Sequence, residues 1–365
     1  MQERESQKKV LAYLKDSRDE MVSLLKTLTD LDSPSTSKEH LDVKVIPQAT
    51  HGNHLRVELG EGSEQVLLLG HYDTVWDPGE SSRRPFRVEN GKAYGPGAYD
   101  MKGGIVEAVF AARALKALGL SPKVRVVVLH NSDEEIGSPS SRSLIEEEAK
   151  RSKAALVLEP SARGGALKTW RKGVGMFQVH IQGRAAHAGA DFEKGASAAK
   201  EAAHQTIYLH GLTDLEEGTT VNVGVVTAGT RSNVVAERAE LKVDLRVKTS
   251  MAAERVIPKI LGLQPVDPRV SVSVEGGLNR PPMERNSKNL ALFQLAKTIG
   301  QAMGMDLVES GTGGGSDGNF TSALGIPTLD GLGPVGDDAH SPGEYLIVDS
   351  LPERAAVLAG LLLSL

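Results

Sequence analysis

Histidines and carboxylates stand in five short segments of the chain, and their types suit joint chemistry. In chain order the groups are His71 with Asp73, Asp100, Glu134 with Glu135, Glu159, and His340. Carboxylates crowded into one cleft repel one another and lose hydration, at a cost of several kcal/mol, unless cations neutralise them. Imidazole among carboxylates suits zinc, cobalt or manganese better than magnesium or calcium, which prefer oxygen ligands. The residue types therefore predict a site for divalent metal ions.

The numbers of histidines and carboxylates fit two ions. One carboxylate that bridges both, with one histidine and one further carboxylate on each ion, leaves room for a shared water. Ions about 3.5–4 Å apart polarise a carbonyl group and lower the pKa of that water. Neighbouring side chains diverge, so one of Glu134 and Glu135 can bind metal while the other acts as general base. The sequence alone leaves open which glutamate takes which role.

Composition narrows the class of protein. The chain has 365 residues, with 42 Lys+Arg against 47 Asp+Glu and a net charge of -5, so nucleic acid is not expected as a partner. There is no cysteine, which excludes thiolate ligands and a cysteine nucleophile. No apolar run approaches the roughly 20 residues of a membrane helix, and the N-terminus shows no export signal. We expect a cytoplasmic protein, or a periplasmic one if a leader was removed.

Apolar runs predict strands just before three of the groups. These runs are Val66–Leu69, Val124–Leu129 and Ala154–Leu158. Their nearly continuous valines and leucines predict a sheet buried on both faces. Helices are expected over Lys8–Leu28, Gly103–Leu118 and Leu144–Lys150. This alternation predicts an α/β sandwich, in which ligands gather at the carboxyl ends of the strands.

From Gly173 the pattern changes to strict alternation of apolar and polar residues, which predicts strands with one wet face. The expected order is a strand at 174–182, a helix at 195–210, strands at 220–227 and 237–248, a helix at 250–262 and a strand at 269–276. This βαββαβ order is ferredoxin-like. The α/β pattern resumes from Asn289, with a helix near 290–303 and a last helix ending at Leu365. We therefore expect an α/β catalytic domain over 1–172 and 283–365, interrupted by an inserted domain over 173–282.

Five motifs resemble those of the M20 family of dinuclear zinc peptidases, and within it the glutamate carboxypeptidases of the carboxypeptidase G2 type. They are Gly70–Val75, Gly95–Gly104, Ser132–Ser138, Leu158–Pro160 and Ala339–Ser341. The similarity runs from about Val66 to the C-terminus, and the order and spacing of the motifs agree with the family.

The resemblance implies a role for each member of the acidic and histidine groups. It makes Asp100 the bridging ligand, His71 and Glu159 the other ligands of one zinc, Glu135 and His340 those of the second, Glu134 the general base and Asp73 the partner of His71. The implied cofactors are two Zn²⁺ ions per chain, with Co²⁺ or Mn²⁺ as possible replacements. The inserted domain corresponds to the family's dimerisation or lid domain, which implies a homodimer.

The resemblance also implies residues outside the metal site. His187 corresponds to a histidine that reaches the active site of the neighbouring subunit and stabilises the oxyanion. Asn233 and Arg246 resemble residues that bind substrate carboxylates, and Arg280 is a further candidate. The loop Gly311–Gly318, with Gly314 and Gly315, offers backbone N–H groups to an anion but lacks the Gly-Lys-Ser/Thr ending of a phosphate loop.

These expectations describe a metal-dependent exopeptidase. Its substrate would be a peptide or an N-acyl amino acid, and the amide bond to a C-terminal glutamate or similar residue would be cleaved. A deacylase or dipeptidase of the same family is the nearest alternative. A metal-dependent phosphohydrolase and an inactive binding module are more distant ones. The basic stretch Ala166–Gly173, which contains Trp170, departs from the family pattern near the expected substrate site.

Overall fold

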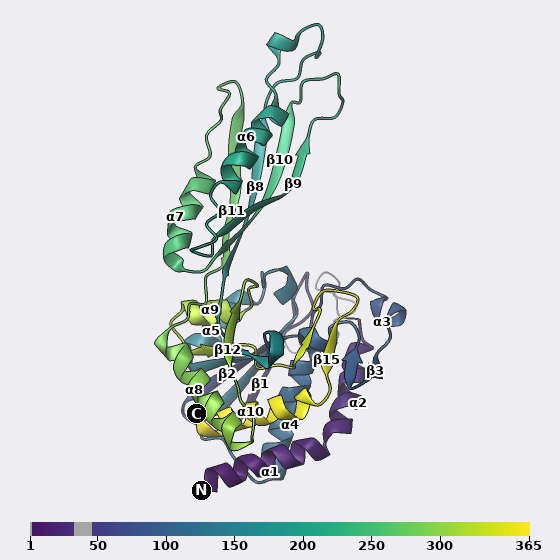
Figure 1. Ribbon diagram of the computed structural model, residues 1–365, viewed down its shortest axis with the longest axis vertical. Helices are drawn as coiled ribbons and strands as arrows, with labels where there is room; N and C mark the ends of the chain where they lie inside the picture. The colour runs from purple at the N-terminus through teal and green to yellow at the C-terminus, as the bar shows by residue number, and fades with distance from the viewer. Residues whose placement is uncertain (1, 33–45) are drawn as a thin grey trace. The chain divides into compact units, whose positions relative to one another are not determined.

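A computed structural model describes residues 2–32 and 46–365 of the chain. These residues form two compact units (Figure 1). Unit 1 contains the described residues up to Trp170 together with Arg285–Thr312 and Ser316–Leu365. Unit 2 contains Arg171–Glu284 and the short turn Gly313–Gly315. The chain thus leaves unit 1 once for a long insertion and a second time for three glycines.

Unit 1 is built around a five-stranded sheet with the order β1-β5-β2-β6-β13. The strands are β1 (Leu55–Leu59), β2 (Gln65–His71), β5 (Arg125–Asn131), β6 (Ser152–Val157) and β13 (Thr328–Leu329). Neighbours among β5, β2, β6 and β13 run parallel, whereas the edge strand β1 is antiparallel to β5. The parallel strands all end at one edge of the sheet, which is where the acidic groups of the sequence follow them.

Helices cover both faces of this sheet, as the valine and leucine runs predict. On one face lie α1 (Gln2–Asp16), α2 (Arg18–Thr29), α4 (Gly103–Ala117), α8 (Ser287–Ala302) and α10 (Ser350–Ser364); on the other lie α5 (Arg142–Lys150) and α9 (Gly318–Ala323) (Figure 1). Along β2, Val66 and Leu68 belong to the first core, and Leu67 and Leu69 to the second. A strand buried on both faces must be apolar at every position, so the predicted α/β sandwich is confirmed.

The prediction of one helix over Lys8–Leu28 is wrong, because the segment forms two helices. The break lies at Ser17, between α1 and α2. The Ser17 hydroxyl donates to the carbonyl oxygen of Tyr13 at 2.9 Å, four residues back. Serine bonds of this kind compete with the backbone ladder and bend helices. The apolar spacing continues across the bend, which is why the sequence pattern did not reveal it.

Several short strands were not predicted from the sequence. The strands β3 (Arg87–Glu89), β4 (Lys92–Tyr94), β14 (Gly336–Asp337) and β15 (Tyr345–Ile347) form a small sheet with the order β14-β15-β4-β3, and β7 (Leu167–Arg171) pairs with β12 (Glu309–Thr312). The short helix α3 (Glu80–Arg83) precedes β3. Two or three residues are too few to show a periodic pattern. The small sheet matters for function, because the loop between β14 and β15 carries His340.

Unit 2 is a four-stranded antiparallel sheet with two helices on one face. Its elements are β8 (Gly173–Gln182), α6 (Ala198–His210), β9 (Thr220–Ala228), β10 (Arg238–Val247), α7 (Ser250–Leu261) and β11 (Ser271–Arg280), in the sheet order β11-β8-β10-β9. Alternate residues of β8 and β10, such as Val179 and Leu241, join the core under the helices. The polar residues between them face the other side. The expected ferredoxin-like βαββαβ order is confirmed.

In the parts of the chain that the structure describes, none of the helices has both the length and the apolar character required to cross a bilayer.

Candidate metal centre

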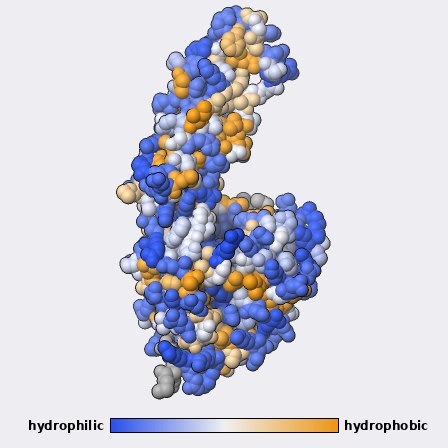
Figure 2. Space-filling model, in the orientation of Figure 1, coloured by the Kyte–Doolittle hydropathy of each residue, from blue (hydrophilic) through white to orange (hydrophobic). Residues whose placement is uncertain are grey.

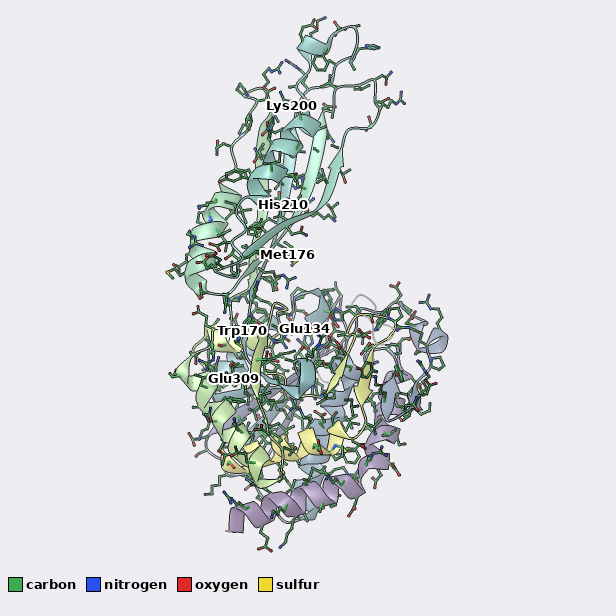
Figure 3. The ribbon with its side chains drawn as sticks, in the orientation of Figure 1. Glu134, Trp170, Met176, Lys200, His210 and Glu309 are labelled. Atoms are coloured by element: carbon green, nitrogen blue, oxygen red, sulfur yellow. The ribbon has the colours of Figure 1, made fainter. Side chains whose placement is uncertain are left out.

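The acidic and histidine groups of the sequence meet at one edge of the main sheet of unit 1. His71 is the last residue of β2, and the glutamate pair and Glu159 follow the neighbouring strands β5 and β6. Because these strands are parallel, their carboxyl ends lie side by side. Figure 3 labels Glu134 at this edge of unit 1. The loop between β14 and β15 adds His340, because β15 pairs with β4, which precedes Asp100.

Asp100 lies between the two histidines. Its Oδ1 atom is 3.4 Å from Nε2 of His71, and its Oδ2 atom is 3.2 Å from Nε2 of His340. His71 Nε2 is also 3.3 Å from Oε1 of Glu159, and His340 Nε2 is 3.2 Å from Oε2 of Glu135. Nε2 of each histidine therefore contacts a carboxylate that the other does not, Glu159 for His71 and Glu135 for His340, and both contact Asp100. This is the arrangement that a carboxylate bridging two ions requires.

Buried polar atoms without partners indicate that these residues fit metal ions. Nε2 of His71, Oδ1 of Asp100 and Oε1 of Glu135 are buried and have no hydrogen-bond partner among the described residues. Ligand atoms of these three residues lie within 4.8 Å of one another, as do those of His71, Glu134 and Glu159. Unpaired buried polar atoms are costly, and cations would satisfy them. Nitrogen and oxygen donors of this kind suit zinc, cobalt or manganese.

The pKa shifts of the site follow from mutual neutralisation. Hydrogen bonds from His340 to Asp100 and Glu135 raise the pKa of this imidazole to about 11. Burial raises the pKa of Glu135 to about 7, although His340 opposes the shift. Burial also disfavours the charged form of Asp100, but the two histidines outweigh it and hold the pKa of this carboxyl well below its usual range. In the metal-free protein, protonated histidines thus neutralise part of the carboxylate charge that metal ions would neutralise.

Asp73 supports both the first histidine and the glutamate pair. It is fully buried, and its two oxygens accept backbone N–H groups of Glu134 at 3.3 Å and Glu135 at 3.2 Å. Nδ1 of His71 lies 3.0 Å from the backbone oxygen of Asp73 and 3.4 Å from its Oδ1. The sequence predicts the contact with His71, but the two N–H bonds depend on tertiary structure. Through them Asp73 orients the loop that carries Glu134 and Glu135.

The loop that carries His340 has an unusual backbone. Asp338 and His340 adopt positive φ angles of 64° and 62°. Residues with a side chain rarely adopt this left-handed conformation, and such strain gathers at functional sites. His340 is held in a specific orientation by a loop and not by a strand.

The fold and the clustered ligands agree with the comparisons with known proteins. The model of peptidase family M20/M25/M40 matches residues 67–364. The chain belongs to this family. Carboxypeptidase G2 of Pseudomonas sp. (strain RS-16) is 33% identical over 311 residues, which cover 84% of this chain and 75% of that protein. Acetylornithine deacetylase of Myxococcus xanthus is 28% identical over 312 residues, covering 82% and 80%.

Solved structures show the same fold. Aminopeptidase PepT from Bacillus cereus ATCC 10987 matches with a TM-score of 0.76 at 22% identity, covering 94% of this chain and 98% of that one. M20 proteins are metal-dependent hydrolases that usually hold two ions, and the residue groups of this chain fit that description. The relatives named here are a carboxypeptidase, a deacetylase and an aminopeptidase. Membership of the M20 family therefore establishes a hydrolase but does not select its substrate.

Unit 2 places His187 and Asn233 next to each other. His187 pairs with Val234 in a single bridge between strands, and the N–H of Ala188 donates to the backbone oxygen of Asn233 at 3.0 Å. Nδ1 of His187 accepts N–H groups of Gly189 at 3.1 Å and Ala190 at 3.0 Å. These bonds place the ring proton of the neutral imidazole on Nε2. The exposed side of the ring is therefore a hydrogen-bond donor.

Three arginines converge on the glycine turn within unit 2. Arg246 donates to the Gly313 oxygen at 3.4 Å and forms a two-pronged ion pair with Asp244. The Cδ atom of Arg280 lies only 2.8 Å from where a Cβ on Gly315 would stand, so a larger residue would collide there. Sequence reasoning singled out Arg246, Arg280 and the glycines.

The third arginine, Arg171, was not chosen as a candidate. It is buried, and its Nη1 donates to the carbonyl oxygens of Gly314 at 3.4 Å and Gly315 at 3.1 Å. The signal that could have found it was the basic stretch around Trp170. Trp170 itself, labelled in Figure 3, lies on β7, which pairs with β12. Its ring leaves no room for a side chain on Gly311.

Proposed function

We propose that this M20 hydrolase removes a C-terminal amino acid, glutamate or a similar acidic residue, from a peptide or an N-acyl amino acid. The observation that carries the proposal is Asp100 lying between two histidines, each of which has its own further carboxylate. The proposed ligands of one ion are His71, Asp100 and Glu159, and those of the other are His340, Asp100 and Glu135. Two bound divalent ions would polarise the scissile carbonyl and acidify the attacking water.

Glu134 is proposed as the general base, the role that the family resemblance implies, and is kept out of both ligand sets although its carboxylate lies close to His71 and Glu159. Its backbone is held by Asp73, and its carboxylate reaches the His71 side of the cluster. It would take a proton from the attacking water and then deliver that proton to the leaving amine nitrogen. Its neighbour Glu135 faces His340 instead. The divergence of adjacent side chains thus separates the base from the ligand.

The preference for an acidic leaving residue rests on the cationic side chains of unit 2. Arg171, Arg246 and Arg280 surround the glycine turn, whose N–H groups can also receive a carboxylate. A guanidinium bonded to a carboxylate contributes about 1.5–3 kcal/mol. Arg246→Met is therefore expected to lower kcat/KM for an N-acyl glutamate by roughly 10- to 150-fold. An N-acyl leucine keeps the α-carboxylate and lacks the side-chain carboxylate, so a loss confined to the glutamate substrate assigns Arg246 to the side chain, and an equal loss with both substrates assigns it to the α-carboxylate.

A homodimer through unit 2 is the second part of the proposal. Large apolar side chains are exposed there, among them Ile207 at 74%, Leu215 at 77% and Met251 at 70%. Figure 2 shows such residues among hydrophilic ones on the visible face. The edge strand β9 adds Val226 at 51%. Exposed apolar residues and an open strand edge both favour association. His187 would then serve the site of the partner.

Sedimentation tests this assembly. Val226→Arg is expected to give a monomer that still binds its metals but turns over poorly. Val57→Arg, on the edge strand β1 of unit 1, is the matched control and should stay a dimer. A wild-type chain that is monomeric at working dilution and fully active would refute the role of His187 in a neighbouring subunit.

The role of Glu134 is tested by Glu134→Gln, which keeps the size of the side chain and removes the base. With two metals bound as in the wild type, kcat should fall by roughly 10²–10⁴. Glu147→Gln, at an exposed position on α5, is the control and should be fully active. Full turnover by Glu134→Gln on every amide that the wild type cleaves would overturn the assignment.

A substrate panel separates the proposal from its nearest alternative. Carboxypeptidase G2 and acetylornithine deacetylase are both relatives, so N-acyl glutamate, N-acyl leucine, acetylornithine and several dipeptides should be compared with zinc, cobalt and manganese. The highest kcat/KM is expected for the N-acyl glutamate. A clear preference for acetylornithine or an apolar residue would favour a deacylase of the same family.

A further inference from the structure

A buried carboxylate next to the metal centre, Glu344, is explained by neither metal binding nor proton transfer. Its side chain is only 2% exposed. Oε1 accepts the backbone N–H groups of Tyr99 and Asp100, both at 3.0 Å. Oε2 accepts the backbone N–H of Gly97 at 3.1 Å and the indole N–H of Trp76 at 3.3 Å. Each oxygen thus has two donors, which is the full capacity of a carboxylate.

The donors come from segments that carry proposed metal ligands. One of them is the N–H of Asp100 itself, and two others belong to the turn just before it. Trp76 lies on the segment that follows His71 and Asp73 along the chain. Glu344 stands four residues after His340. A single side chain therefore ties together three segments that are far apart in sequence and that the proposed centre needs side by side.

A second contact strengthens the link to the His340 loop. The Arg84 guanidinium stacks over the Trp76 ring, 3.9 Å from its centroid. Nη1 of the same arginine is 3.4 Å from the carbonyl oxygen of Ser341, the residue after His340. Trp76 is thus fixed between Glu344 and Arg84. Both of these neighbours also touch or belong to the loop that holds the second histidine.

We infer that Glu344 is a positioning residue that holds Asp100 and His340 in the geometry in which they bind metal. The inference rests on the proposed metal ligands. It does not depend on which amide the enzyme cleaves. Partners of metal ligands typically change metal affinity by 10- to 100-fold when they are removed. Glu344 acts through backbone N–H groups, so its loss should release the bridging ligand and the exposed histidine together.

The sensitive variant is Glu344→Gln. Glutamine keeps the size of the side chain, but its NH₂ group would face N–H donors where Oε2 now accepts two bonds. We expect zinc affinity, measured by competition with a chromogenic chelator, to fall about 10- to 100-fold for at least one ion. The visible absorption spectrum of the cobalt-loaded protein should change as well, because it reports ligand geometry.

A matched control is available at the opposite end of β2. Glu148 is 1% exposed and accepts hydrogen bonds from Arg56 at 2.7 Å and Gln65 at 3.0 Å. Glu148→Gln is expected to lower the unfolding midpoint while leaving zinc affinity and the cobalt spectrum as in the wild type. This comparison separates positioning of the metal ligands from the general cost of altering a buried glutamate.

If Glu344→Gln does not fold, Trp76→Phe provides a second variant for the same two measurements. It removes one donor and leaves the three backbone bonds, so the cobalt spectrum should shift and zinc affinity should fall by a smaller factor. Wild-type affinity for both ions together with an unchanged cobalt spectrum, in whichever variant folds, would overturn the inference. A wild-type protein that binds fewer than two ions would instead refute the proposed dinuclear centre.

Discussion

The two halves of the proposed metal centre differ in how firmly the protein holds them. His71 is 1% exposed and ends the central strand β2, which has a parallel neighbour on each side. His340 is 50% exposed and stands in a loop between two strands of two and three residues. We call these the buried half, with His71 and Glu159, and the exposed half, with His340 and Glu135. A rigid strand end fixes a ligand before metal arrives, whereas a loop must be held by other contacts.

Protein-only electrostatics differ between the halves in the same way. In the buried half, water is excluded from His71, which contacts Asp73, Asp100 and Glu159. In the exposed half, solvent reaches His340 and screens its two carboxylate contacts. Histidine–carboxylate contacts of similar length therefore contribute different interaction energies in the two halves. The two halves therefore differ in the exposure of their histidines, since the carboxylates Glu135 and Glu159 are both largely buried.

The largest expected effect compares His71→Ala with His340→Ala in the metal-free protein. Removing His71 leaves buried carboxylates uncompensated, so the free energy of unfolding should fall by about 3–5 kcal/mol. Removing the half-exposed His340 should cost less, because solvent screens this imidazole, although its partners Asp100 and Glu135 are largely buried. Urea unfolding in the presence of a chelator measures both. Equal losses would show that the halves do not differ in the way their burial indicates.

The second prediction concerns Asp73, which serves both halves through His71 and through the N–H of Glu135. Asp73→Asn keeps the shape but replaces one acceptor oxygen by a donor. Metal affinity should fall about 10- to 100-fold. Competition titration with zinc measures it, and Asp306→Asn, in the segment between α8 and β12 of unit 1, is a control on a carboxylate away from the centre. A wild-type affinity in Asp73→Asn would contradict the supporting role.

The sequence was informative where elements are long and where chemistry follows a strand. β2, β5 and β6 are continuous apolar runs, and each ends just before a polar group, so both the sheet and its functional edge were predictable. The six-element order of unit 2 was predictable because its strands are nine or ten residues long, and β10 and most of β8 alternate between buried and more exposed residues. The family resemblance followed from the same polar groups and is confirmed.

The sequence was uninformative where burial is created only by tertiary contacts. Glu344 precedes a three-residue strand and is buried because the turn 97–100 folds over it. Arg171 is a charged residue in a basic stretch, and nothing in its neighbours indicates that it bonds a glycine turn more than 140 positions away. The break at Ser17 is confined to a single residue between two helices. Such features carry no period and no motif, so they become visible only in the folded chain.

The third prediction is that a chelator removes the two ions in separate steps. The exposed half should lose its ion first, at a chelator concentration roughly tenfold lower than the buried half requires. This factor corresponds to a difference of about 1.4 kcal/mol in the free energy of metal binding. Metal analysis after dialysis against graded concentrations of dipicolinate measures this. His340→Ala should abolish the first step and leave the second in place. Loss of both ions in one step in the wild type would mean that the shared Asp100 couples the halves completely.

The smallest expected effect is the pH dependence that His340 gives to the metal-free protein. The carboxylates of Asp100 and Glu135 raise the pKa of His340 to about 11, above its ordinary value of 6.5. A raised folded-state pKa on a base adds stability that is fully present below pH 6.5 and is lost as the pH rises towards 11. Because His340 is half exposed, we expect the benefit to be a Tm shift of roughly 2–4 °C, the change that about 1 kcal/mol produces in a domain of this size.

The Tm difference between wild type and His340→Ala, measured at pH 6 and pH 9.5 with a chelator present, isolates this contribution. Lys102, whose pKa burial lowers to about 8, titrates in the same range in both proteins. Glu135 contacts His340, so the difference reports the His340–Glu135 pair together. The difference should be largest at pH 6 and smaller at pH 9.5. If it instead grew with rising pH, His340 would be neutral in the metal-free fold, and the exposed half would be prepared for metal without first releasing a proton.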